Sequence, residues 1–228
     1  MRARTIAAAK RPPQPYEQLA FSWCAILRSR RRFMKKEEIT TAPRFTSADL
    51  ESFPDDGKRY EIIDGELYVS KQLHFYHQRV CSRILLKLQQ WSQQSGDGEA
   101  VIAPGLVLAD DDDVAPDVVW VSSRRMATTL GDDGKFHAAP ELIVEVLSPG
   151  AANEKRDRDA KLKLYSRRGV DEYWIMDWRR RSVEVFRRKN ARLILTTTLR
   201  DSDILTTPLL SRFACPVSEL FEGIPSKT

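Results

Sequence analysis

The sequence predicts an α/β domain in which helices flank a mixed central β-sheet, and three observations favour this fold class. The first is the run Leu142–Leu147, which is apolar except at Glu145 and lies between two prolines, as expected of a strand buried on both faces. The second is a four-turn apolar helical stripe within residues 77–91. The third is Asp64-Gly65 between two β-prone runs, a strong hairpin signal. Strands and helices of this kind pack in layers around one core.

Length and composition are those of an ordinary globular chain. Of its 228 residues 42% are hydrophobic and 30% are charged. No apolar stretch approaches the ~20 residues of a membrane helix, so we expect no membrane partner. The three cysteines, Cys24, Cys81 and Cys215, are far apart and form neither a disulfide framework nor a paired-cysteine metal site. We therefore expect a reducing compartment, the cytoplasm.

Positive charge is concentrated at the N-terminus. Residues 1–45 hold 11 Lys/Arg and 3 Asp/Glu, which leaves 26 and 29 for the rest of the chain. We therefore predict a basic N-terminal extension, residues 1–44, that is disordered or loosely helical, followed by one domain over residues 45–228. The body is slightly acidic, so net charge alone does not predict that it binds nucleic acid.

The first elements of the domain are a short helix and a hairpin. A helix is expected over residues 46–53, capped by a hydroxyl side chain in front of its first turn. The hairpin of residues 60–69 follows, and its two-residue turn places Glu61 opposite Tyr68.

The middle of the chain alternates helical and extended segments. The amphipathic helix of residues 77–91 leads into a strand over residues 101–108, interrupted by a Pro-Gly pair. Asp110–Asp113 lacks the ligand spacing of a calcium loop and is interpreted as a solvated turn. The apolar run 118–121 is a further strand, and residues 122–138 resemble a loop.

The C-terminal part begins with the central strand, 142–147. A helix over residues 153–168 follows it and ends at Gly169. The remaining expected elements are the strands 173–176, 183–186 and 193–195 and a short final helix.

Three acids share this buried context. Glu145 lies near the end of the central strand, where a carboxylate is costly to bury unless a lysine, a network of donors or a metal ion pairs with it. Asp117 precedes another buried strand, and Glu61 lies in the hairpin. If the strands of Asp117 and Glu145 are neighbours, the two carboxylates converge and repel each other unless a cation lies between them. Oxygen ligands of this type favour Mg²⁺ or Mn²⁺.

A lysine completes the set. Asp157, Lys161 and Tyr165 are spaced four residues apart on the helix after the central strand, so they share one face. Leu164 beside them indicates that this face points inward. Lys161 would then have an acidic partner, whereas Tyr165 is interpreted as core packing.

The order of these segments resembles the Uma-two family of putative restriction endonucleases, within the PD-(D/E)XK nuclease superfamily. The resemblance covers residues 45–190 and rests on six ordered motifs: YEIIDGEL (60–67), His77 at the start of a helix, APDVVWV (115–121), PELIVEVLSPG (140–150), D-x-x-x-K-x-x-x-Y (157–165) and GVDEYWIMD (169–177). It implies a restriction-endonuclease-like fold and a Mg²⁺- or Mn²⁺-dependent endonuclease that hydrolyses phosphodiester bonds in DNA, as a monomer or a homodimer.

The resemblance also implies roles for individual residues. Asp117 and Glu145 would be the metal ligands, and Glu61 would add a ligand or a water contact. The lysine usually found two residues after the acid is replaced by Leu147, which implicates Lys161 on the following helix. His77 would contact phosphate or substrate.

Each assignment has a structural alternative. Glu145 and Lys161 could form a buried salt bridge without a metal, or Lys161 could be a solvated partner of Asp157. Asp117 could cap a loop, Glu61 could be a surface cross-strand residue, and His77 could be packed in the core. Two further classes therefore stay open: a catalytically silent nucleic-acid-binding protein that retains the nuclease fold, and a metal-free interaction protein.

Overall fold

The structure, a computed structural model, describes residues 43–71 and 73–225, and all of them belong to one compact unit. The predicted basic extension lies outside the described residues except for Pro43 and Arg44. Arg44 forms an ion pair with Asp111 at 2.7 Å. The first element is α2 (Ser47–Leu50), which is shorter than predicted and has Thr46 as its N-cap.

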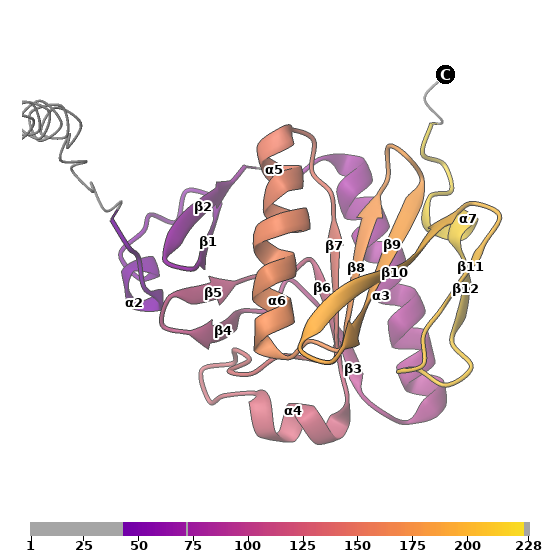
Figure 1. The fold of residues 1–228 in the computed structure, drawn as a ribbon, viewed down its shortest axis with the longest axis horizontal. Helices are drawn as coiled ribbons and strands as arrows, with labels where there is room; N and C mark the ends of the chain where they lie inside the picture. Colours follow the sequence, from indigo (N-terminus) through magenta and orange to yellow (C-terminus); the bar gives the residue numbers. More distant parts are fainter. Residues whose placement is uncertain (1–42, 72, 226–228) are drawn as a thin grey trace, which may run out of the picture. The chain divides into compact units, whose positions relative to one another are not determined.

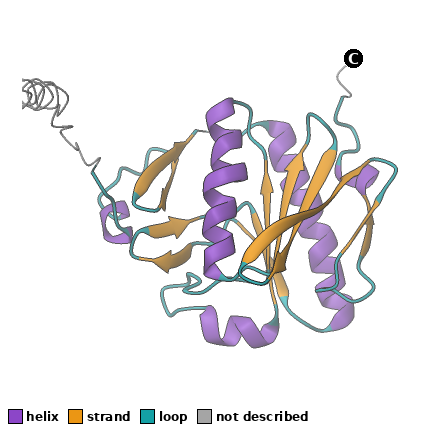
Figure 2. Cartoon of the chain, viewed as in Figure 1, coloured by secondary structure: helices purple, strands orange, loops and turns teal. Residues whose placement is uncertain are grey.

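A six-stranded mixed sheet forms the centre of the fold, as the sequence predicts (Figure 2). Its strand order is β10-β9-β8-β7-β6-β3, with β7 and β8 parallel and all other neighbours antiparallel. The predicted central strand is β7, which is buried along its whole length. The strands are β3 (Glu99–Ile102), β6 (Val118–Val121), β7 (Leu142–Val146), β8 (Glu172–Asp177), β9 (Ser182–Lys189) and β10 (Arg192–Arg200).

Helices cover both faces of this sheet (Figure 1). On one face lies α3 (Phe75–Ser95), whose buried Val80, Ile84 and Leu88 confirm the predicted stripe. On the other face lies a helical column that follows β7 and contributes Leu164 and Tyr165 to a second core. It consists of α5 (Ala151–Lys155), the π-helix η1 (Arg156–Lys161) and α6 (Leu162–Arg168).

Alternation along β7 decides which helix each side chain meets. Val144 and Val146 belong to the core beneath α3, whereas Ile143 and Leu147 belong to the core beneath α6. Glu145 therefore points to the side of the helical column. Position 147, where the usual nuclease motif has a lysine, is filled by a fully buried leucine.

A second, four-stranded sheet carries the predicted hairpin, in the order β2-β1-β5-β4. Its turn residues Asp64 and Gly65 have φ values of 53° and 74°, which a two-residue hairpin turn requires. Glu61 pairs with Tyr68, as predicted. The strands are β1 (Arg59–Ile63), β2 (Glu66–Ser70), β4 (Leu106–Ala109) and β5 (Asp112–Val114).

The prediction of a solvated turn at Asp110–Asp113 is wrong for its second half. Asp112 is fully buried at the start of β5, where Arg167 and Arg168 both donate to its carboxylate. These partners lie more than 50 positions away in the sequence, so local composition gave no sign of the burial.

The predicted loop of residues 122–138 contains α4 (Ser123–Thr129), which begins at the N-cap Ser122. Its residues are mostly polar, and it has no apolar stripe that would have revealed it. The C-terminal segment adds a small hairpin and a short helix: β11 (Ile204–Thr206), β12 (Ala214–Pro216) and α7 (Val217–Leu220).

The helix predicted over residues 153–168 is interrupted by a π-helical turn, η1. Its residues Asp157 and Lys161 are both buried, which is unusual for charged side chains. π-Turns occur mostly as short insertions in α-helices and are frequent at functional sites. The turn places Lys161 2.9 Å from Glu61 on β1 and 2.8 Å from Glu145 on β7, and it places Asp157 beside Arg156.

Candidate active site

Glu145, at the C-terminal end of β7, is anchored by two donors from the helical column. Lys161 Nζ lies 2.8 Å from Glu145 Oε1, and the Tyr165 hydroxyl donates to the same oxygen at 2.9 Å. Glu145 and Lys161 are both at least 98% buried. The other oxygen, Oε2, accepts no hydrogen bond from the described residues. One side of this carboxylate is therefore available to a further ligand.

Glu61 lies on β1 and reaches the same lysine from the small sheet. Its Oε1 is 2.9 Å from Lys161 Nζ and accepts a hydrogen bond from the Ala115 N–H at 3.0 Å. Its Oε2 is buried and has no hydrogen-bond partner among the described residues, although Arg156 lies 3.8 Å away. A buried carboxylate oxygen without a donor is costly, so this atom also offers a ligand position.

Asp117 immediately precedes β6 and is held from three directions. Its Oδ2 accepts from the Val146 N–H at 2.9 Å and lies 3.1 Å from His77 Nε2 on α3. Its Oδ1 accepts from the Arg59 guanidinium at 3.2 Å. These contacts fix the orientation of the carboxylate.

Asp117 lies where β6 begins and β7 ends. Strands β6 and β7 are antiparallel with Val118 opposite Val144, and Asp117 directly precedes Val118. The Asp117 carboxylate accepts from the N–H of Val146, the residue that follows Glu145. The two acids are close enough for the Asp117 charge to raise the pKa of Glu145.

Acids outnumber bases in this buried cluster. Four carboxylates, on Glu61, Asp117, Glu145 and Asp157, are each at least 95% buried. Three Arg and Lys side chains reach them, and these are Arg59, Arg156 and Lys161, while the imidazole of His77 also contacts Asp117. The carboxylates therefore outnumber the Arg and Lys side chains by one.

The pKa values reflect this excess. Burial, reinforced by the charges of neighbouring acids, raises the pKa of Glu145 to about 8 although Lys161 opposes the shift. Burial also acts to raise the pKa of Asp117, but the hydrogen bond with His77 and the charges of Lys161 and Arg59 lower it overall. The pKa of Lys161 is raised, since its acidic neighbours outweigh its burial. Glu145 is thus the acid that most needs an additional positive charge.

The residues present fit a hard divalent cation. Glu61 Oε2 is buried and has no hydrogen-bond partner within the part of the chain that the structure describes, both donors to Glu145 contact its Oε1, and Asp117 accepts from the N–H of the residue after Glu145. Carboxylate oxygens are the ligands that Mg²⁺ and Mn²⁺ prefer, and a divalent ion would offset the excess negative charge.

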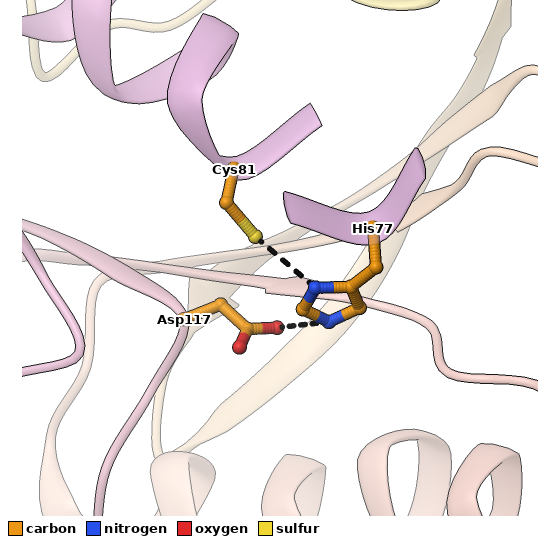
Figure 3. Close-up of side chains that lie close together, drawn as sticks. All are labelled: His77, Cys81 and Asp117. Carbon is orange, nitrogen blue, oxygen red and sulfur yellow. Dashed lines mark hydrogen bonds and ion pairs between the residues drawn. The ribbon is translucent and has the colours of Figure 1, made fainter. Parts of the chain in front are cut away.

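The structure adds four residues to the predicted site. Arg59 and Arg156 contact Asp117 and Glu61, and neither shows a periodic signal in the sequence. Tyr165 packs in the core as predicted but also donates to Glu145. Cys81, one helical turn after His77, lies 3.5 Å from His77 Nδ1 (Figure 3). The i, i+4 spacing of His77 and Cys81 was the only available sequence signal for this contact.

His77 is 99% buried, and each of its ring nitrogens faces another side chain (Figure 3). The sequence suggested either a substrate contact or a packed core histidine for this residue. In the structure it is buried against Asp117 and Cys81.

The fold is shared with a protein described as a putative nuclease. The crystal structure of a putative nuclease belonging to DUF820 from Anabaena variabilis ATCC 29413 matches with a TM-score of 0.63 and 16% sequence identity. The match covers 78% of this chain and 97% of that one. This likeness, with the mixed central sheet and its flanking helices, supports the restriction-endonuclease-like fold class that the sequence predicts.

The chain belongs to the Uma2 family, described as putative restriction endonuclease, whose sequence profile matches residues 47–218. This match confirms the resemblance seen in the ordered motifs. None of the curated proteins matches this chain. Among the described residues, no helix combines the length and the apolar character required to cross a membrane.

Proposed function

We propose that this protein is a Mg²⁺- or Mn²⁺-dependent endonuclease that hydrolyses phosphodiester bonds in DNA. The observation that carries the proposal is the convergence of Glu61, Asp117 and Glu145 around the edge of β6 and β7, with more acids than bases in the cluster. Membership of a family described as putative restriction endonuclease supports the choice of substrate class.

In this proposal Asp117 and Glu145 hold the metal, and Glu61 contributes its free oxygen directly or through water. A divalent ion bound there would lower the pKa of a water ligand and stabilise negative charge on a phosphate. The Val146 N–H and Arg59 keep Asp117 oriented, which limits the reorganisation needed when a ligand arrives.

Lys161 takes the place of the lysine missing from position 147. It approaches Glu145 from the π-turn of the helical column instead of from β7 itself. Its ammonium group has three N–H donors, and two acids account for two of them. The third donor would orient the attacking water or stabilise charge developing on the phosphate.

We propose that the substrate binds in a hollow on the far side of Arg156 from Glu61. It has a volume of about 490 Å³ and is lined in part by Ser70, Lys71, His74 and Asn153. Ser70 accepts a hydrogen bond from Arg156 at 2.6 Å, and Arg156 lies beside Glu61, so the hollow is linked to the cluster. Lys71, His74 and Asn153 would bind the phosphate backbone.

The test is cleavage of supercoiled plasmid DNA, with an RNA of mixed sequence tested in parallel. Nicking is expected with Mg²⁺ or Mn²⁺ and is expected to disappear with EDTA or in the Glu145→Gln variant. Asp112→Asn, which removes a buried carboxylate outside the site, is the matched control and should retain activity. Equal nicking by Glu145→Gln would locate the activity elsewhere, and cleavage of RNA alone would exclude DNA as the substrate.

A second candidate is a nucleic-acid-binding protein without catalytic turnover. The observation that favours it is the complete burial of Lys161, which is paired to both Glu61 and Glu145. Salt-dependent DNA binding without cleavage under any divalent metal would select this candidate.

A further inference from the structure

Asp117 is the end of a chain of three buried side chains that begins inside α3. Cys81 Sγ lies 3.5 Å from His77 Nδ1, and His77 Nε2 lies 3.1 Å from Asp117 Oδ2 (Figure 3). All three residues are at least 95% buried. No water from bulk solvent competes for these contacts, so each polar atom depends on its neighbour.

The arrangement of Cys81, His77 and Asp117 differs from a metal site built on the same residues. Their donor atoms lie within 4.8 Å of one another, yet the thiol and the carboxylate face different nitrogens of one imidazole ring. A metal ion binds one nitrogen of a histidine, while the other nitrogen makes a hydrogen bond that orients the ring. Here the imidazole lies between the other two groups.

Donor and acceptor roles follow from the three groups. Burial, with the nearby charges of Asp117 and Glu145, raises the pKa of the Cys81 thiol, so it retains its proton. The carboxylate of Asp117 can only accept, which requires the proton of the imidazole to be on Nε2. In a neutral imidazole the other nitrogen, Nδ1, then carries no proton and accepts from the S–H of Cys81.

We propose that His77 and Cys81 are positioning residues for Asp117: the thiol donates to Nδ1, and the Nε2–H donates to Asp117 and fixes its carboxylate for metal binding. This inference rests on the proposed function and adds two residues that act through Asp117 without touching substrate. It assigns His77 a different role from the substrate contact that the sequence suggested.

The arrangement of donors around Asp117 shows what this positioning achieves. A carboxylate has about four lone-pair positions, and three are taken by His77, the Val146 N–H and Arg59. Oδ2 already has two donors, so the open lone-pair position is on Oδ1, the oxygen that Arg59 contacts. Loss of the His77 hydrogen bond would let the carboxylate rotate and would open a second lone-pair position, on Oδ2 instead of Oδ1.

The first test reads the imidazole itself and needs no metal or activity. The chain has only three histidines, so long-range ¹H–¹⁵N NMR resolves His77, and His77→Gln identifies its signals. The expected pattern is a protonated Nε2 and a bare Nδ1. The Nδ1 resonance should move in Cys81→Ala and stay in place in Cys215→Ala, the same change at another buried cysteine. A protonated Nδ1 in the wild type, or an Nδ1 resonance unmoved in Cys81→Ala, would overturn the proposal.

The second test measures Mg²⁺ affinity by calorimetry without substrate. Gln at position 77 can place its amide N–H near the position of Nε2, so His77→Gln should bind within about 3-fold of wild type. His77→Leu should lose about 10- to 100-fold, the usual effect of removing a group that orients a metal ligand. Equal affinity of the Leu and Gln variants, both folded by thermal melting, would refute the positioning role. If neither the wild type nor any variant binds Mg²⁺, the proposed function fails. The NMR result still decides whether Cys81, His77 and Asp117 are hydrogen-bonded as proposed.

Discussion

The protein buries carboxylates in two separate places, and the two differ in charge balance. At the start of β5, Asp112 is paired with Arg167 at 2.7 Å and with Arg168 at 2.6 Å. Where β6 begins and β7 ends, four acids share three Arg and Lys side chains. The first place has the composition of a structural ion pair, and the second has that of a cation site.

The pKa shifts follow the same division. Burial acts to raise the pKa of Asp112, but hydrogen bonds from Arg167, the Asp64 N–H and Arg168 lower it overall. The pKa of Glu145 is instead raised to about 8 because burial and neighbouring acids outweigh Lys161. A buried acid with enough donors stabilises the fold as an anion, whereas one with too few donors favours binding of a proton or a cation.

The largest expected effect separates activity from stability. Glu145→Gln should lower the cleavage rate by at least about 100-fold, because a charged ligand is lost. The neutral amide oxygen still accepts from Lys161 and Tyr165, so the unfolding temperature without metal should stay the same or rise. Asp112→Asn should show the opposite pattern, a lower unfolding temperature with activity retained. Plasmid nicking and thermal melting, measured on both variants, check this; a marked loss of stability in Glu145→Gln would contradict the claim of excess acid.

Removal of a base should be more costly in the acidic cluster than at Asp112. Lys161→Met leaves Glu61 and Glu145 without their shared cation, so we expect a loss of about 3–5 kcal/mol in the free energy of unfolding. Arg167→Met leaves Arg168 in place on Asp112 and acts at a partly exposed side chain, so about 1 kcal/mol is expected. Urea unfolding at pH 7 measures both values, and losses of equal size would show that the two places do not differ.

The smallest expected effect is a pH dependence at Asp112. Its folded pKa lies below the ordinary value of 3.8, so its contribution to stability is complete above that pH. The contribution is lost as the pH falls through the folded value, because protonation removes the ion pair. The stability difference between wild type and Asp112→Asn should therefore be constant from pH 7 to about 5 and shrink below about 4. A difference that grows in acid would reverse the assigned sign.

Local patterns were sufficient to predict most of the fold. The apolar run of β7, the stripe on α3 and the Asp64-Gly65 turn each specify an element through short-range periodicity or turn geometry. The elements that were missed, such as α4 and the π-turn η1, depend on tertiary contacts or on a backbone insertion that sequence spacing does not reveal.

The site was only partly predictable for the same reason. Glu145 stood out because a charge in an apolar run is conspicuous, and Lys161 followed from helical spacing and family resemblance. Arg59 was not predicted, since its contact with Asp117 joins residues 58 positions apart. The burial of Asp112 was not predicted. Asp112 lies in a run of four aspartates that indicated an exposed turn, and its burial is explained by arginines distant in the sequence.

Calorimetric titration with Mg²⁺ and with Mn²⁺ tests the central claim most directly. Wild type and Asp112→Asn should both give a saturable isotherm, because Asp112 lies outside the proposed site. Asp117→Asn should give none, because this substitution removes a charged ligand. Binding that survives Asp117→Asn unchanged, or no binding by the wild type with either metal, would contradict the account of a divalent cation held between Asp117 and Glu145.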